Sequence, residues 1–143
     1  MSYELQTEGG LTVMGIAVRT SNGTAHHIGE LWRRFHTMGN QEAIAARESE
    51  AIYSVYCEYE GDYTQKFTVV IGCAVAPDAE VPEGMKKVAV EGGEFAVFPV
   101  TGELPAGVFR TWSQIWEMRL ERRYQADFDR YQDGAVTIHV GVR

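Results

Sequence analysis

The chain has 143 residues, enough for one hydrophobic core, because a globule of this size buries roughly two-thirds of its unfolded surface. Apolar residues make up 45% and charged residues 23%, which argues against disorder. The formal charge of −7 argues against direct nucleic-acid binding and is compatible with cationic partners. No apolar run could span a bilayer, no secretory signal is present, and two cysteines make no disulfide scaffold. We therefore expect a cytoplasmic protein with no membrane partner.

The hydrophobic pattern alternates between strand-like and helix-like segments. The predicted strands are residues 11–19, 51–59, 66–76, 85–90, 94–100, 127–132 and 136–142. Apolar stripes at helical spacing over residues 28–38 and 108–120 predict two helices, with Gly39 ending the first and Pro105 opening the second. Residues 41–50 are expected to form a loop that allows a short helical turn. Hairpin turns are predicted at residues 60–62 and at Asp133-Gly134.

The order of these elements predicts a βαββ unit used twice. Trp116 lies 84 positions after Trp32, and at the same offset Val97 matches Val13. A duplicated unit buries its apolar faces against its copy. We therefore expect one α+β domain over residues 1–143, with a strongly curved antiparallel sheet and both helices on one side. The junction of the two halves is the expected place for a ligand cleft.

Several kinds of chemistry find little support in the sequence. No nucleophile elbow, phosphate-binding loop or Cys-x-x-Cys pair occurs. The four histidines lack metal-ligand spacing, so we expect neither a metal nor a cofactor. Cys57 and Cys73 lie within predicted strands, which is typical of buried, unreactive thiols.

The aromatic residues and one strand of the second half suggest a binding site. Trp112 and Trp116 are neighbours on one helical face. Period-two alternation places Asp127, Asp129 and Tyr131 together on one face of their strand. A carboxylate beside these rings would form an aromatic cage with an anionic floor. Two alternatives remain open: the tryptophans could belong to the core, and Asp129 could pair with an arginine of residues 119–123.

The chain resembles the small bacterial effector-binding proteins with GyrI-like domains, which are related to the drug-sensing domains of AraC-type and MerR-type regulators. Within this group it is most similar to the stand-alone integron cassette effector-binding proteins. The resemblance runs from Leu11 to Val142 and depends on the order and spacing of its segments. The segments are Gly15-Ile16, Arg19-Thr20-Ser21-Asn22, Leu31-Trp32, Ile52-Tyr53-Ser54-Val55-Tyr56, Tyr59-Glu60-Gly61-Asp62-Tyr63-Thr64, Val70-Ile71-Gly72, Pro82-Glu83-Gly84-Met85, Phe95-Ala96-Val97-Phe98, Gly102, Trp112-Ser113-Gln114-Ile115-Trp116, Arg123-Tyr124 and Asp127-Phe128-Asp129-Arg130-Tyr131.

The resemblance implies a duplicated βαββ fold that binds hydrophobic, often cationic, small molecules between its halves. Together with the residue patterns, it leads us to expect ligand binding by Asp129, Tyr131, Trp112, Trp116, Trp32, Phe98 and His139. Asp129 stands where the family usually has a glutamate that neutralises the ligand's charge. His139 stands where the family often has a tyrosine, and a protonated histidine would disfavour cations.

Two other functions are kept as alternatives. Relatives that hydrolyse small electrophiles suggest an enzyme in which Asp129 activates water with Tyr131 assisting. The resemblance to gyrase-inhibitor-like proteins suggests, as the second alternative, a module that binds another protein. The sequence predicts neither the oligomeric state nor the natural ligand.

Overall fold

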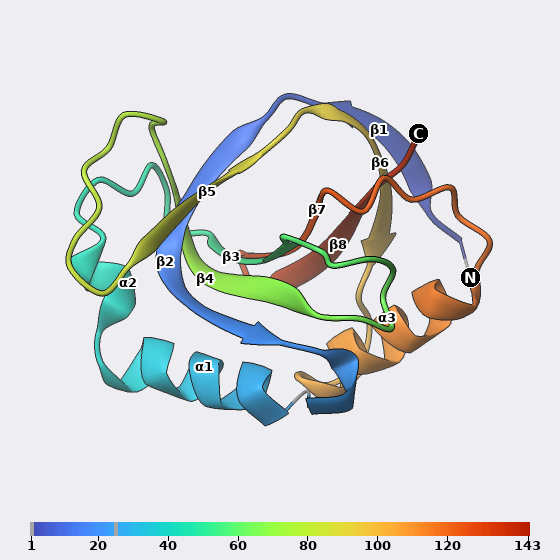
Figure 1. Cartoon of the computed structure of the whole chain (residues 1–143), viewed down its shortest axis with the longest axis horizontal. Helices are drawn as coiled ribbons and strands as arrows, with labels where there is room; N and C mark the ends of the chain where they lie inside the picture. The colour runs from blue at the N-terminus through green and yellow to red at the C-terminus, as the bar shows by residue number, and fades with distance from the viewer. Residues whose placement is uncertain (1, 25) are drawn as a thin grey trace.

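A computed structural model describes residues 2–24 and 26–143 of the chain. In these residues the chain forms eight strands, two long helices, a short helix and one 3-10 turn (Figure 1). The elements are β1 (Glu4–Glu8), β2 (Leu11–Thr20), η1 (Asn22–Thr24), α1 (His26–Thr37), α2 (Asn40–Ala43), β3 (Ile52–Cys57), β4 (Phe67–Val75), β5 (Lys86–Val90), β6 (Gly93–Pro99), α3 (Ala106–Glu117), β7 (Ala126–Gln132) and β8 (Ala135–Gly141).

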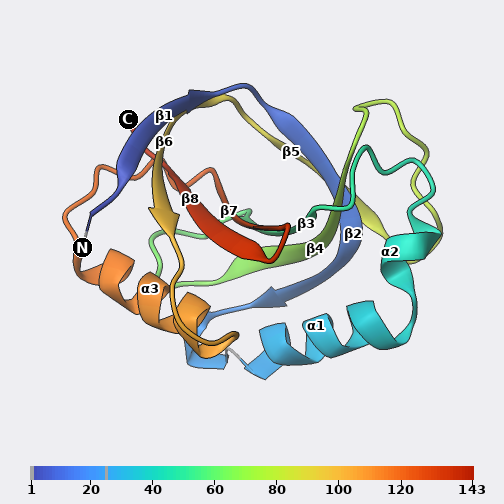
Figure 2. The same cartoon turned by 180° about the vertical axis from the view of Figure 1, so that it is seen from behind.

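The strands form one antiparallel sheet in the order β1-β6-β8-β7-β3-β4-β2-β5. The order is symmetric about the β3–β7 pair, since β2-α1-β3-β4 and β6-α3-β7-β8 occupy equivalent places. The sheet curves strongly, and α1 and α3 both lie on its outer side (Figure 2). The prediction of an α+β fold with a curved antiparallel sheet is confirmed.

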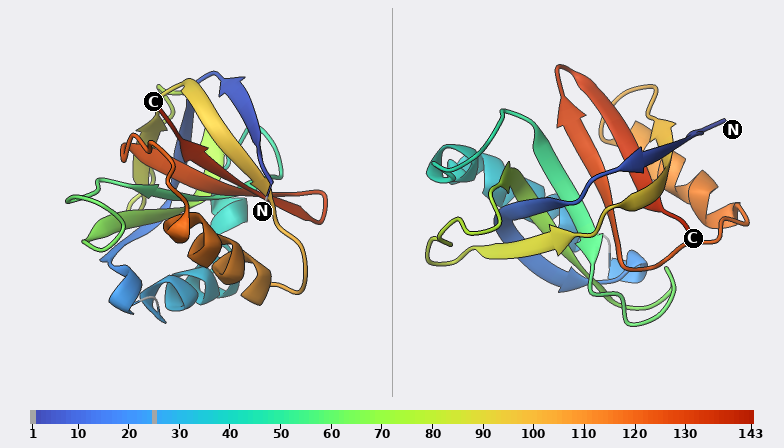
Figure 3. Two further views of the ribbon diagram at one scale, coloured as in Figure 1. Left: turned by 90° about the vertical axis from the view of Figure 1, so that its right-hand side faces the viewer. Right: turned by 90° about the horizontal axis from the view of Figure 1, so that it is seen from above.

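Strand β1 was not predicted, and it completes the symmetry of the fold. It precedes β2 in the chain but pairs with β6, just as β5 precedes β6 but pairs with β2. The two halves therefore exchange their edge strands (Figure 3). Most of β1 is exposed, so its residues carry little of the hydrophobic alternation by which strands are recognised.

The exchange brings two chain segments into close contact where the edge strands join their neighbours. A Cβ on Gly10 would lie 2.9 Å from the Val90 carbonyl oxygen, and one on Gly92 would lie 2.8 Å from the Gly10 nitrogen. Gly93 has a φ of 147°, which L side chains rarely adopt. Glycine is therefore required at this crossing because the backbones approach too closely for side chains.

Side-chain alternation gives the sheet two different apolar faces. On the inner face of the curve, Val13, Val55, Val70, Phe95 and Phe128 belong to one core cluster. On the outer face, one cluster lies under α1 and a second lies under α3. Large side chains such as these stabilise the fold by roughly 1.5–3 kcal/mol each when fully buried.

Buried side chains anchor both helices to the outer face of the sheet. Leu31 and Phe35 of α1 are each 1% exposed, and so is Ile115 of α3. Two details of the predicted stripes are wrong: Met38 is exposed, and Leu120 lies beyond the end of α3 at Glu117. The chain passes through a left-handed φ of 62° at Gly39, two residues after the end of α1, as predicted for a helix stop.

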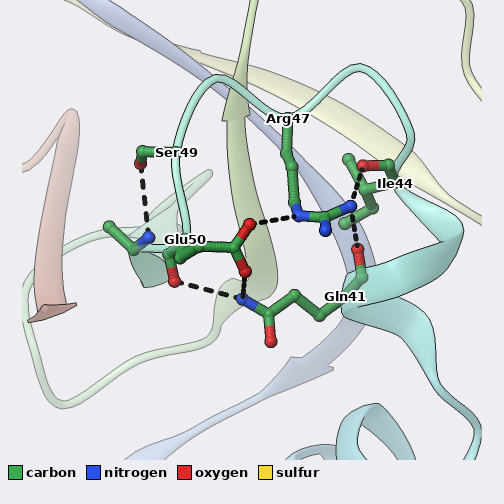
Figure 4. A network of polar contacts seen from close by, with 6 residues as sticks. Gln41, Ile44, Arg47, Ser49 and Glu50 are labelled. Atoms are coloured by element: carbon green, nitrogen blue, oxygen red, sulfur yellow. Dashed lines mark hydrogen bonds and ion pairs between the residues drawn. The ribbon is translucent and has the colours of Figure 1, made fainter.

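The connection between α1 and β3 is ordered by its own polar contacts (Figure 4). The Arg47 guanidinium donates to the carbonyls of Gln41 and Ile44 and pairs with the Glu50 carboxylate at 3.2 Å. The Gln41 amide donates to the Glu50 carbonyl, and the backbone N–H of Ala51 donates to Ser49. The predicted loop with a helical turn is confirmed, and these contacts fix the start of β3.

Two further predictions concern the cysteines and the hairpin turn. Cys57 and Cys73 are free and buried, and burial raises their thiol pKa values to about 12 and about 11. The expectation that both thiols are buried is confirmed, and the raised pKa values disfavour the reactive thiolate form. Asp133 and Gly134 both have positive φ, as the two central residues of a tight hairpin require. Among residues 2–24 and 26–143 no helix is long and apolar enough to cross a membrane.

Candidate ligand-binding site

A cavity of about 230 Å³ opens between α1 and α3, over the central β3–β7 pair. Both halves of the chain contribute to its walls. Its lining residues are Asn22, Ile28, Gly29, Trp32, Tyr56, Tyr59, Tyr63, Phe67, Pro105, Val108, Phe109, Trp112, Trp116, Arg122 and Tyr131. The cavity forms at the junction of the duplicated halves because neither helix covers the middle of the sheet.

Aromatic rings in edge-to-face and stacked pairs form most of the wall. Trp32 of α1 meets Tyr131 of β7 with ring centroids 4.9 Å apart and planes at 72°. Tyr56 of β3 meets Trp112 of α3 in the same manner at 5.2 Å. Such pairs hold one another in place and present both ring faces and ring edges to a ligand.

The outer part of the wall is more exposed. Tyr63, in the connection between β3 and β4, stacks on Trp116 of α3 at 5.6 Å with planes only 7° apart. Phe109 meets Trp116 edge-to-face with ring centroids 6.2 Å apart and is 60% exposed. The amide of Asn22 donates to the Tyr63 carbonyl at 2.6 Å, which fixes this connection to the turn before α1. These residues form an apolar rim on which a flat ligand could be placed.

Asp129 lies one layer behind the cavity wall. Its carboxylate is fully buried and accepts hydrogen bonds from the Tyr56 hydroxyl at 2.6 Å and from the Trp112 indole Nε1 at 2.9 Å. Burial raises the pKa of Asp129 to about 7, although both hydrogen bonds oppose this increase by stabilising the ionised form. Near neutral pH this carboxyl group is therefore close to its pKa, and its hydrogen bonds to Tyr56 and Trp112 link it to the cavity wall.

A second buried acid, Asp127, lies two residues away on the same face of β7. Its Oδ2 accepts from the Tyr59 hydroxyl at 2.5 Å and from Arg122 Nη2 at 2.7 Å, and its Oδ1 accepts from the Gly141 backbone N–H at 2.8 Å. The Arg122–Asp127 ion pair is almost completely buried. Arg122 therefore neutralises Asp127, and the open alternative that it pairs with Asp129 is not what the structure shows. Among the described residues no cationic side chain pairs with Asp129.

The structure brings together five of the seven residues that the sequence suggested. Trp32, Trp112, Trp116 and Tyr131 line the cavity, and Asp129 lies directly behind it. The alternation predicted for β7 is correct, because Asp127 and Asp129 both hydrogen-bond to residues of the cavity wall, while Phe128 lies in the inner cluster.

Phe98 and His139 lie elsewhere, which corrects the expectation for these two residues. Phe98 is fully buried in the core cluster that lies under α3, and its ring contacts the ring of Tyr3. His139 faces the inner side of the sheet, where it stacks on Phe128 with centroids 4.4 Å apart and shares a 2.7 Å hydrogen bond with Glu8. Burial lowers the pKa of His139, with Glu8 opposing the shift. Period-two alternation places His139 on the face of the sheet opposite the cavity, so its side chain does not contribute charge to the cavity wall.

Several wall residues were not identified as site residues from the sequence. Tyr56 lies opposite Asp127 in the β3–β7 register, and its neighbour on the same face, Ser54, lies opposite Asp129. The alternation of residues 51–59 would have placed Tyr56 on that face once the pairing with β7 was known. Tyr59, Tyr63 and Arg122 lie in connections, where no period indicates which way a side chain points.

The fold and cavity together define a small effector-binding domain built from two similar halves that exchange their edge strands. The sequence model of the integron-associated effector binding proteins, Cass2, matches residues 4–142, and the chain belongs to this family.

Comparison with known proteins gives consistent results. The integron cassette protein VCH_CASS2, from the mobile metagenome of Vibrio cholerae, is 28% identical, and its structure superposes with a TM-score of 0.80 over 99% of this chain and 95% of that one. SAV2435, whose structure was solved bound to tetraphenylphosphonium, is 21% identical with a TM-score of 0.81 over 100% and 94% of the two chains. YobU of Bacillus subtilis (strain 168), a candidate transcriptional regulator, is 24% identical over 90% of both chains.

Proposed function

We propose that this protein is a binding module for hydrophobic organic cations, which occupy the aromatic cavity between α1 and α3. The observation that carries the proposal is the buried Asp129 carboxylate, which is hydrogen-bonded to Tyr56 and Trp112 of the wall. The other acid, Asp127, is neutralised by Arg122. With Asp129 ionised, the three buried charges sum to one negative charge, which a monovalent cation would balance.

The physical magnitudes favour a flat or bulky cation over a small one. A charge about 6 Å from the Asp129 carboxylate gains about 3 kcal/mol at an effective dielectric near 20, before desolvation. Each well-placed ring face adds about 0.5–2 kcal/mol. Apolar burial contributes roughly 25 cal/mol per Å², and the loss of free motion offsets much of the total. A small, strongly hydrated cation would obtain only the first of these contributions.

The relatives support this class of ligand. Tetraphenylphosphonium, the compound bound in the structure of SAV2435, is a cation covered by four aromatic rings. The resemblance to a candidate transcriptional regulator supports a role in which the bound ligand acts as an effector. The position of Asp129 favours binding over hydrolysis, because both carboxylate oxygens are occupied by Tyr56 and Trp112 and the residue is fully buried.

The proposal is tested with two ions of matched shape and opposite charge. Tetraphenylphosphonium and tetraphenylborate are titrated separately into the protein, and binding is followed by tryptophan fluorescence and by calorimetry. We expect the cation to bind at least one hundred times more tightly than the anion, because only the cation is attracted to Asp129. Equal affinities would show that the cavity selects shape without charge and would refute the proposal.

A variant pair locates the charge. Asp129→Asn removes the charge and keeps the size of the side chain, and we expect it to weaken phosphonium binding at least tenfold. Asp133→Asn removes an exposed acid in the β7–β8 turn and is the matched control, with affinity expected within twofold of the original. Equal losses in both variants would point to a general charge effect and against a role for Asp129.

A further inference from the structure

Gly29 leaves a gap in the α1 wall of the cavity. The residue lies within α1, is exposed and lines the cavity. A Cβ on Gly29 would have no neighbour within 4 Å among the described residues, apart from the two adjacent residues and the backbone of its own helix. A side chain would therefore fit here without a clash, in space at the edge of the cavity. We call this space the gap beside Gly29.

The local backbone does not require glycine at this position. The φ of Gly29 lies outside the left-handed range that favours glycine. Gly107 of α3 differs, because a Cβ there would lie 2.6 Å from the Thr101 carbonyl oxygen. Glycine also disfavours helix formation, since it loses the most backbone freedom on folding. Neither conformation nor close packing explains Gly29, and the feature that it does provide is free space beside the cavity.

The matching position in the second half carries a large ring. Both α1 and α3 have twelve residues, and their first residues lie toward the middle of the molecule (Figure 1). The sixth and tenth positions are buried in both helices, and the seventh is a tryptophan that lines the cavity, Trp32 or Trp112. The structure thus aligns Trp32 with Trp112, and not with Trp116 as the sequence suggested. At the fourth position α1 has Gly29 and α3 has Phe109, so the cavity wall is aromatic on α3 and open on α1.

We propose that Gly29 determines the size of the ligand: one bulky group of the bound cation occupies the gap beside Gly29, while the charged centre faces the Tyr56–Trp112 wall in front of Asp129. This inference rests on the proposed function and adds the class of ligand, which is a cation wide enough to span from the rings of α3 to α1. A side chain at position 29 would fill the gap and exclude the bulky group, but it would leave the rings of the other wall unchanged.

The experiment compares two cations that differ by one ring. Tetraphenylphosphonium carries four phenyl groups, and methyltriphenylphosphonium has a methyl group in place of one of them. We expect the original protein to bind the four-ring cation at least fivefold more tightly. Gly29→Leu should weaken tetraphenylphosphonium binding at least tenfold and methyltriphenylphosphonium binding less than threefold, because the leucine takes the place of the fourth ring. Tryptophan fluorescence and calorimetry measure both affinities.

Glu30→Leu is the matched control. It adds the same side chain at the next residue of α1, which is exposed and does not line the cavity. The loss of this acid affects both cations alike, so the ratio of their affinities should stay within twofold of the original. Urea denaturation should show Gly29→Leu to be at least as stable as the original protein, since leucine favours a helix more than glycine does. Should Gly29→Leu be less stable, Gly29→Ala adds only a Cβ in open space and must still lower the ratio at least twofold.

The outcomes separate this inference from the proposed function. If the original protein binds tetraphenylphosphonium and Gly29→Leu weakens both cations equally or neither of them, the size-determining role of Gly29 is wrong while cation binding stands. If Glu30→Leu lowers the ratio as much as Gly29→Leu does, the gap is not the cause and the inference also fails. If neither cation binds to the original protein, the proposed function fails and the inference fails with it.

Discussion

Replacing Asp129 with asparagine should stabilise the folded protein at neutral and alkaline pH, even though it weakens ligand binding. Burial raises the pKa of Asp129 from 3.8 to about 7. Between these two values the folded state holds a proton that the unfolded state has lost. The free energy of unfolding therefore falls as the pH rises through this window. Asparagine resembles the protonated acid and does not undergo this loss.

The expected size follows from the shift in pKa. Each unit is equivalent to about 1.36 kcal/mol, so a shift from 3.8 to about 7 makes the ionised acid about 4 kcal/mol less favourable in the folded state. Asparagine can keep both contacts: its Oδ1 accepts from the Trp112 indole, and its Nδ2 donates to the oxygen of the Tyr56 hydroxyl. The stability gain should be near zero at pH 4 and approach about 4 kcal/mol at pH 8.

The assay is urea denaturation followed by tryptophan fluorescence at pH 4 and pH 8. Asp133→Asn serves as the control, because its side chain is exposed and its loss should produce no pH-dependent difference. An Asp129→Asn variant that is no more stable than the original protein at pH 8 would refute the reasoning. It would mean that the two hydrogen bonds to the carboxylate outweigh its burial.

The remaining predictions concern pH and backbone packing. Tetraphenylphosphonium affinity should rise with pH by up to about tenfold per unit below pH 7 and level off above it. Below pH 7, each bound cation should release one proton. Calorimetry in buffers of different ionisation enthalpy measures both the affinity and the proton release. Trp112→Phe removes a hydrogen-bond donor that lowers the pKa of Asp129, so the midpoint of the pH dependence of tetraphenylphosphonium affinity should move to higher pH. An unchanged midpoint would contradict the hydrogen bond assigned to Trp112. Gly15→Ala should destabilise the fold by about 1–3 kcal/mol or more in urea denaturation, because its Cβ would lie 1.9 Å from the Ile71 carbonyl oxygen. Gly9→Ala, with nothing within 4 Å, should be close to neutral, and equal losses in both would argue against the clash.

Local patterns in the sequence were sufficient for the main elements and for one face of the site. Hydrophobic spacing located both long helices and seven of the eight strands, since each buries a regular stripe or face. The alternation in residues 127–131 placed Asp127 and Asp129 on the cavity side without knowledge of the neighbouring strands. The exposed strand β1 was missed because it is held by backbone pairing with β6, which leaves no apolar period in its own residues.

What the sequence determined by itself is the duplicated α+β architecture and the presence of an acid and several rings that face the two helices. Only the tertiary structure decided that Arg122 pairs with Asp127, which leaves Asp129 with no cationic partner in the part of the chain that the structure describes. It also decided that Phe98 and His139 lie outside the cavity. The physical reason is that period and composition report which side chains are buried, whereas the choice of partner depends on distances between segments far apart in the chain. Those distances are set when the two halves exchange their edge strands and pack together.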